Sequence, residues 1–293
     1  MQLSTSTNIQ DSYRRVQGVV SMEECIKSCR TAGYSVMDMN FCDMSNPGMP
    51  LVKDDWQAWT ERIGNLAKEL GVEFSQSHAN FFNFLDPQID NLEFREEMVR
   101  RSIIASGMLA VPWMTMHAGT DSTHGGYSDK RSLEGNIRYL TPFVEMAVKH
   151  GVGITLENMY DPTPQERLFT ASADNLLSLV DAFDPAAVGV CWDFGHANLV
   201  GMDQVASIRE VGGKRLKAVH VADNNGVKDD HLLPFYGMID WPPLMAVLKE
   251  IGYSGDFTYE IQRFMDRVPP ELRQTALRHT VEVGEYLIGL GDE

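Results

Sequence analysis

Short apolar runs alternate with longer amphipathic stretches from one end of the chain to the other. The apolar runs predict β-strands near residues 2–8, 34–40, 72–78, 112–117, 153–158, 188–193, 216–222 and 256–261. Apolar residues at helical spacing predict helices near residues 21–32, 55–70, 92–107, 132–150, 172–183, 203–212, 241–251 and 270–289. The order predicts eight strand–helix units without a long linker.

Local sequence signals support several of these boundaries. Ser21 and Glu24 have the spacing of a capping box at the start of a helix. A glycine between a helical pattern and the next strand is typical of a helix end, where φ is positive. Four glycines have this position: Gly33, Gly71, Gly151 and Gly252.

Eight strand–helix units in 293 residues predict an α/β fold, specifically a (β/α)₈ TIM barrel that forms one domain over residues 1–293. The alternative is an open, doubly wound sheet. No glycine-rich phosphate loop follows the first strand, which argues against the dinucleotide-binding form of that sheet. In a barrel, functional side chains gather at the carboxyl ends of the strands.

Metal-binding residue types stand at the ends of four successive predicted strands: Glu157, Asp193, His220 and Glu260. Burying such side chains is costly unless something pairs them, and neighbouring barrel strands bring their ends to one rim. Their oxygen and nitrogen atoms suit manganese, magnesium, cobalt or zinc. We therefore predict that these four residues bind one divalent metal ion.

Each of the four residues also has a purely structural interpretation. Glu157 could pair or cap on a loop, and Asp193 could cap the following helix. His220 could be a core histidine with satisfied hydrogen bonds, and Glu260 a charge at the rim. Their shared position at consecutive strand ends favours the metal site.

Other histidines follow the same strands. His196 lies three residues after Asp193, and His231 follows Asp229 and Asp230 on a long loop. His78 and His117 end the third and fourth predicted strands, whereas His124 and His150 have no such placement. The first four are candidates to contact a substrate or a second ion.

Composition restricts the partners. The chain has 41 acidic and 25 basic residues, a formal net charge of −16, which repels nucleic acid at long range. No stretch approaches the roughly 18 apolar residues of a membrane span, and the first residues lack the pattern of a secretory signal. Four cysteines are too few for a disulfide scaffold of this length. We expect a soluble, cytoplasmic protein that binds neither nucleic acid nor membranes.

Five motifs together resemble the xylose-isomerase-like TIM barrel superfamily, in particular its sugar isomerase and epimerase branch. They are Leu-Glu-Asn at 156–158, Trp-Asp-Phe-Gly-His at 192–196, Val-His-Val-Ala-Asp-Asn at 219–224, the loop with Asp-His-Leu-Leu-Pro and Gly-Met-Ile-Asp-Trp at 230–241, and Tyr-Glu at 259–260.

The resemblance implies that Glu157, Asp193, His220 and Glu260 hold one metal ion and that His196 contacts substrate oxygens. It also implies that Glu157 and Glu260 act as the acid/base pair, with His231, His117 and His78 as further substrate-binding candidates. The reaction would be isomerisation or epimerisation of a sugar, sugar acid or cyclitol through a metal-stabilised enediolate.

One position departs from the pattern of the ketose epimerases, which carry an arginine six residues after the metal-binding histidine. This chain has Gly226 there, with Lys228 nearby as a point-charge substitute. Because of this departure, we expect a sugar, sugar-acid or cyclitol substrate and do not restrict it to a free ketose. The same site could also expel a β-hydroxyl group, as in a keto-inositol or sugar-acid dehydratase.

Two further alternatives belong to other classes. Abasic-site endonucleases of the superfamily hold three zinc ions, and His78, His117, His196, Asp229 and His231 match their additional ligands in order. The acidic charge argues against a DNA substrate. A barrel that has lost catalysis and serves as a binding subunit is the other alternative, and the sequence is compatible with a homo-oligomer.

Overall fold

Eight parallel strands close into a barrel in the computed structural model, which describes residues 1–10, 20–123, 125–163 and 165–290. The strands are β1 (Leu3–Ser6), β2 (Val36–Asn40), β3 (Glu73–His78), β4 (Trp113–Met116), β5 (Gly153–Glu157), β6 (Val188–Asp193), β7 (Leu216–Val221) and β8 (Phe257–Tyr259). Each strand pairs with the next in parallel, and β8 pairs with β1. The predicted (β/α)₈ TIM barrel is confirmed.

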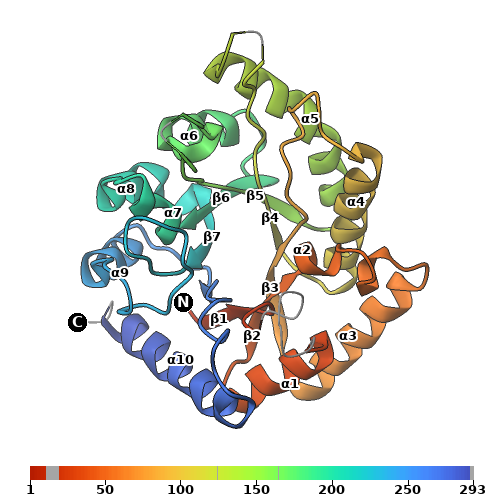
Figure 1. The fold of residues 1–293 in the computed structure, drawn as a ribbon, viewed down its shortest axis with the longest axis vertical. Coiled ribbons are helices and arrows are strands. Elements are labelled where there is room, and N and C mark those ends of the chain that lie inside the picture. The colour runs from red at the N-terminus through yellow and green to blue at the C-terminus, as the bar shows by residue number, and fades with distance from the viewer. Residues whose placement is uncertain (11–19, 124, 164, 291–293) are drawn as a thin grey trace.

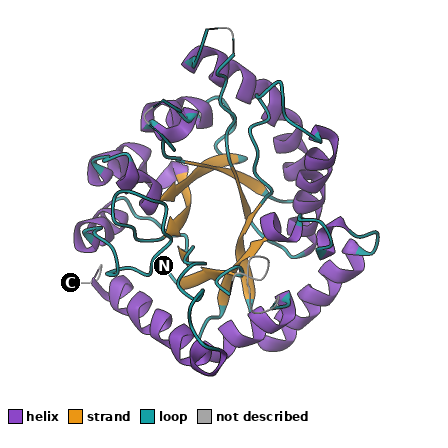
Figure 2. Cartoon of the chain, viewed as in Figure 1, coloured by secondary structure: helices purple, strands orange, loops and turns teal. Residues whose placement is uncertain are grey.

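The longer helices form a ring outside the strands (Figures 1 and 2). They are α1 (Met22–Ala32), α3 (Trp56–Leu70), α4 (Leu92–Met108), α5 (Asp129–Lys149), α6 (Ala173–Val180), α8 (Gln204–Arg215), α9 (Trp241–Glu250) and α10 (Pro270–Leu290). Each corresponds to a predicted helix. None of the described helices is both long and apolar enough to cross a membrane.

Short helical segments at the ends of strands were not predicted. Helix α2 (Phe41–Met44) follows β2 directly, and α7 (Phe194–Leu199) follows β6. The remaining two are 3₁₀ turns, η1 (Pro50–Val52) and η2 (Phe169–Ala171). Segments of this length are too short to show helical periodicity in a sequence.

The local signals define most helix ends. Ser21 and Glu24 form the predicted capping box of α1, and Gly33, Gly71, Gly151 and Gly252 all have positive φ. Helix α5 begins three residues before its predicted start, because the Ser128 side chain accepts a hydrogen bond from the Arg131 amide.

Alternation along each strand decides which side chains enter the barrel. On β5, Ile154 and Leu156 are fully buried, whereas Thr155 and Glu157 have the opposite parity and face inward. Thr155 Oγ1 lies 2.9 Å from Thr115 Oγ1 across the interior. The same period of two directs Asp193 on β6 and its cross-strand partner His220 on β7 into the carboxyl end of the barrel.

Candidate metal centre and substrate pocket

The four predicted metal ligands converge at the carboxyl end of the barrel. Each offers one ligand atom, and these atoms all lie within 4.8 Å of one another. Three of the residues come from the ends of β5, β6 and β7, and Glu260 directly follows β8. Glu157, Asp193 and His220 are 1% exposed, so the centre is held by buried side chains.

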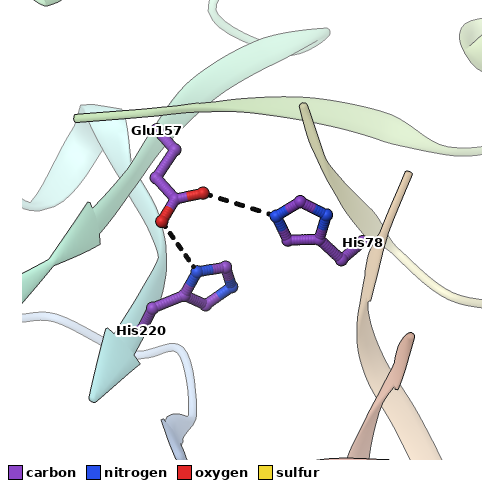
Figure 3. A group of neighbouring side chains, drawn as sticks. All are labelled: His78, Glu157 and His220. Carbon is purple, nitrogen blue, oxygen red and sulfur yellow. Dashed lines mark hydrogen bonds and ion pairs between the residues drawn. The ribbon is translucent and has the colours of Figure 1, made fainter. Parts of the chain in front are cut away.

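Glu157 lies among imidazole rings. Its Oε1 is 3.1 Å from His220 Nδ1, and its Oε2 is 3.4 Å from His78 Nε2 (Figure 3). The same Oε2 is 3.0 Å from His117 Nε2. Burial alone would raise the pKa of Glu157, but the charges of His220 and His117 outweigh it and hold the pKa well below its usual value. The carboxylate therefore stays ionised at neutral pH.

The two carboxylate oxygens of Asp193 have different surroundings: one caps a helix and the other makes no hydrogen bond with the described residues. Its Oδ1 accepts a 2.6 Å hydrogen bond from the His196 amide and so caps α7, as its structural interpretation predicted. Its Oδ2 is buried and has no hydrogen-bond partner among the described residues. A buried carboxylate oxygen without a partner is costly, and a bound cation would satisfy it.

The donor set fits a hard divalent ion. Glu157 Oε2 is also buried and, despite the nearby rings, makes no hydrogen bond of good geometry. Three carboxylates and one imidazole, without a thiolate, match the preferences of manganese, magnesium, cobalt or zinc. The unpaired carboxylate oxygens and the types of ligand atom therefore both fit one divalent ion at these four residues.

Three of the additional histidines, His78, His196 and His231, have Nδ1 held by a main-chain carbonyl oxygen. His78 Nδ1 lies 2.8 Å from the Ala79 oxygen, and His196 Nδ1 lies 2.9 Å from the Asn158 oxygen. Each Nδ1 donates its proton to the carbonyl oxygen, so Nε2 of the same ring is free to contact another group. Both rings line the cavity, so the sequence candidates His78 and His196 are in place to contact a ligand.

His231 and Asp229 form a pair on the loop between β7 and α9. His231 Nε2 is 2.9 Å from Asp229 Oδ2, and its Nδ1 donates to the Glu260 carbonyl oxygen at 2.7 Å. Burial alone would lower the pKa of His231, but the hydrogen bond to Asp229 raises it to about 9. Asp229 Oδ2 is also 3.8 Å from His196 Nε2.

A cavity of about 240 Å³ opens above the centre. Its lining includes all four additional histidines together with Glu157 and Glu260. Phe81 stacks on His117 with ring centroids 4.7 Å apart, and Tyr160 lies 5.0 Å from the His196 ring. A larger hollow of about 760 Å³ is at the opposite end of the barrel, but it is lined by the start of β3 and by α3, away from these groups.

The sequence interpretation missed several polar residues of this region. Asp38 is 1% exposed, and its Oδ2 lies 3.9 Å from His220 Nε2. Burial raises the pKa of Asp38 to about 6. Its signal was a charged residue between Met37 and Met39 inside an apolar run. Other polar residues that line the cavity and were missed are Asn8, Asn40, Asp43, Tyr160, Gln262 and Arg263.

Gly226, Lys228 and His150 lie outside the pocket. Gly226 and Lys228 are exposed and do not line the cavity, so Lys228 does not replace the absent arginine there. His150 is exposed at the end of α5, and His124 lies outside the described residues.

The sequence profile of the xylose isomerase-like TIM barrel family matches residues 26–282. The chain belongs to this family.

Curated relatives point to one branch of it. An uncharacterized protein of Sinorhizobium fredii is 29% identical over 211 residues, which are 70% of this chain and 63% of that protein. The inosose isomerase of Bacillus subtilis is 26% identical over 158 residues, 51% of this chain and 55% of the enzyme. The matched region thus spans less than two thirds of the length of these relatives.

Solved structures share the fold over the whole chain. A D-tagatose 3-epimerase-like protein has a TM-score of 0.75 at 23% identity and covers 100% of this chain and 98% of its own. The IOLI protein, solved with a zinc atom, has a TM-score of 0.71 at 16% identity and covers 100% and 98%. These neighbours are consistent with the sugar isomerase and epimerase branch.

Proposed function

We propose that the protein is a metal-dependent isomerase or epimerase that removes a proton next to the carbonyl of a small, sugar-like substrate. The convergence of Glu157, Asp193, His220 and Glu260 below the cavity carries the proposal. The sugar isomerases and epimerases among the relatives and structural neighbours support it.

These four residues would hold one divalent ion. When bound, such an ion supplies a Lewis acid that polarises the substrate carbonyl and acidifies the neighbouring C–H group. A zinc atom in a related structure supports metal binding. The protein supplies the ligands and a carboxylate that is already ionised.

Two glutamates serve as the acid/base pair. Glu157 comes from β5 and Glu260 follows β8, so their carboxylates reach the centre from separated strands, and both line the cavity. One glutamate, as the carboxylate, takes the α-proton, and the other, which enters the step as the carboxylic acid, gives a proton to the opposite face or to the neighbouring carbon. His196 and His231 orient the substrate oxygens, with His78 and His117 on the β3–β4 side.

Hydrogen–deuterium exchange tests the proposal. Metal-loaded protein in D₂O should exchange the α-proton of at least one compound in a panel of ketoses, sugar acids and keto-inositols. Product analysis then distinguishes isomerisation or epimerisation from loss of a β-hydroxyl group, which would identify a dehydratase. A purified protein that holds no metal and exchanges no compound would instead support a binding subunit.

A multi-metal phosphodiesterase is the second candidate, because the site has more ligands than one ion needs. His78, Glu157 and His220 form another group whose ligand atoms lie within 4.8 Å, and Asp229 lies between His196 and His231. Two or more ions would suit phosphate hydrolysis. The net charge of −16 opposes binding to DNA.

Elemental analysis separates the two candidates. The isomerase proposal predicts about one tightly held divalent ion per chain, whereas the nuclease predicts close to three zinc ions. Salt-sensitive cleavage of abasic DNA at catalytic rates would overturn the isomerase proposal.

A further inference from the structure

Asp38 is a carboxylate inside the barrel that is not one of the four proposed metal ligands. It lies on β2 between Met37 and Met39, which are fully buried, and is itself 1% exposed. Its opposite parity directs it into the barrel, away from the two methionines. Its Oδ1 is buried and has no hydrogen-bond partner among the described residues. Because an unpaired buried carboxylate oxygen is costly, packing alone does not account for an aspartate at this position.

The other oxygen of Asp38 faces one of the proposed metal ligands. Asp38 Oδ2 lies 3.9 Å from His220 Nε2. This distance is longer than a hydrogen bond, so a shift of about 1 Å is needed to form one. Both side chains lie inside the barrel and neither is more than 2% exposed, so water does not compete for this contact.

The two ring nitrogens of His220 face different groups. Nδ1 lies 3.1 Å from Glu157 Oε1 and 3.6 Å from Glu260 Oε2, whereas Nε2 is on the side of the ring away from Glu157 (Figure 3). Nδ1 is therefore the nitrogen that lies beside two other proposed ligands and can bind an ion with them. To bind a metal, Nδ1 must present its lone pair, which places the proton of the neutral imidazole on Nε2.

A buried N–H group at Nε2 needs an acceptor, and the neighbouring side chains offer few. His78 stacks on His220 with ring centroids 5.6 Å apart, but both of its own ring nitrogens have other partners. Cys191 is within hydrogen-bonding reach of the His220 ring, but a thiol sulfur is a weak acceptor. The carboxylate of Asp38 is a much stronger acceptor than the thiol.

We propose that Asp38 is a positioning residue, which accepts a hydrogen bond from His220 Nε2 and so holds the ring in the tautomer and orientation in which Nδ1 can bind the metal ion. A carboxylate in this position makes a histidine a better metal ligand. Asp38 does not line the cavity and acts only through His220. The inference rests on the metal site of the proposed function and adds a residue outside the four ligands.

The metal affinity of Asp38 variants tests the assignment without any substrate. Asp38→Leu should raise the dissociation constants of Mn²⁺ and Zn²⁺, measured by competition with a chromophoric chelator, by about 10- to 100-fold. Asp38→Asn keeps an acceptor oxygen and should show a smaller increase. The Tm of metal-free Asp38→Leu should not fall below that of the wild type, because the variant loses an unpaired buried carboxylate. Unchanged dissociation constants in Asp38→Leu would overturn the inference.

Two control variants separate this role from packing. Gln76 is 2% exposed, pairs with Asp38 in the β2–β3 register, and donates from Nε2 to Thr258 Oγ1 at 2.8 Å. Gln76→Leu should leave the metal dissociation constants unchanged, and an increase equal to that of Asp38→Leu would contradict the assignment. Cys191→Ala removes the other neighbour of His220. A loss of affinity in Cys191→Ala without a loss in Asp38→Leu would make the thiol the acceptor and overturn the inference.

The tautomer of His220 gives a readout that a merely structural role would not change. Long-range ¹H–¹⁵N correlation spectra are recorded on zinc-loaded protein with ¹⁵N-labelled histidine, and the signals of His220 are assigned with the variant His220→Gln. The wild type should show an unprotonated Nδ1 and an Nε2 proton that is protected from solvent exchange, and Asp38→Leu should lose this protection. If Asp38→Leu fails to fold, Asp38→Asn replaces it. A protonated Nδ1 in the zinc-loaded wild type would overturn the inference.

Failure of this inference can be distinguished from failure of the proposed reaction. If the wild type binds metal in an Asp38-dependent way but exchanges no substrate α-proton, the proposed reaction fails and the role of Asp38 stands. If the wild type exchanges an α-proton and Asp38→Leu binds metal as tightly as the wild type, the role of Asp38 fails and the reaction stands. A wild type that binds none of the divalent ions would overturn both.

Discussion

At the scale of single residues, the site is built from pairs in which burial and charge oppose each other. Asp229 and His231 show this most clearly, because a 2.9 Å hydrogen bond raises the pKa of a buried histidine to about 9. Breaking such a pair on one side leaves an uncompensated buried charge. The pair therefore links protonation to the stability of the pocket.

This linkage predicts a pH dependence in the metal-free protein. Because the pKa of His231 rises from about 6.5 in the unfolded chain to about 9 in the folded state, its contribution is complete below pH 6.5 and is lost as the pH rises through 9. The loss amounts to at most roughly 3 kcal/mol of the free energy of unfolding. Urea unfolding at a series of pH values measures it.

The variant His231→Gln is the control for that experiment, because glutamine keeps hydrogen-bonding groups but does not titrate. Its free energy of unfolding should depend less steeply on pH between 6.5 and 9 than that of the wild type. Identical slopes in both proteins would show that another group is responsible.

Only some of the residues of the site could be predicted from the sequence. The four proposed metal ligands could be identified as candidates because β-strand period and strand ends are visible in the pattern of apolar residues. Asn8 and Gln262 could not, since a buried, unpaired amide oxygen is a property of packing and is not visible in the order of residues. The sequence also could not show that Asp193 Oδ1 caps α7 while its Oδ2 is left without a hydrogen-bond partner among the described residues.

At the scale of elements, the loop between β7 and α9 depends on one buried aspartate. Asp223 is fully buried, and its two oxygens accept from four groups: the amides of Asn224, Phe235 and Ile239 and Nε1 of Trp241. The same loop carries Asp229 and His231, whose φ of 47° is unusual for a residue other than glycine. Asp223 thus holds a strained segment against the site.

Asp223→Asn should destabilise this loop. The new NH₂ group would face two donors, so about 3 kcal/mol of unfolding free energy should be lost, by the usual cost of unpaired buried groups and of bonds to a charged acceptor. Asp240→Asn is the matched control, because Asp240 is exposed and makes no side-chain cap at the start of α9.

Denaturant unfolding and hydrogen exchange of the loop amides measure this effect. Asp240→Asn should stay within about 0.5 kcal/mol of the wild type, as surface changes usually do. Equal stability of the two variants would remove Asp223 from its organising role. Asp223 belongs to the Val-His-Val-Ala-Asp-Asn motif at 219–224, but its four donors come from residues up to Trp241 and could be identified only in the structure.

At the scale of the whole molecule, the barrel was predictable and its irregular segments were not. Eight periodic strand–helix units and four glycines at helix ends define the fold closely. The short helices α2 and α7 depend on caps by Asn40 and Asp193 and have no periodicity of their own. Because the N-cap residue of α7, Asp193, is also a proposed metal ligand, we expect the fold and the site to be coupled at that point.

This coupling predicts that metal stabilises the entire barrel. A divalent ion at one hundred times its dissociation constant should add about 2.7 kcal/mol to the free energy of unfolding, and its removal by a chelator should lower the Tm by several degrees. Asp193→Asn keeps an oxygen for the helix cap but weakens the metal site, so its Tm should respond little to chelator. A wild-type Tm that is unchanged by chelator and by added metal would contradict the prediction.

Exchange of the substrate α-proton with solvent, followed by proton NMR, tests the central claim most directly. With metal-loaded wild-type protein in D₂O, the α-C–H signal of at least one ketone should disappear at a catalytic rate. Glu157→Gln and Glu260→Gln should slow this loss by at least about a hundredfold, as expected for removal of a general base, and Glu260→Gln should remain folded. Persistence of the signal with every ketone, or undiminished exchange in both variants, would contradict the account.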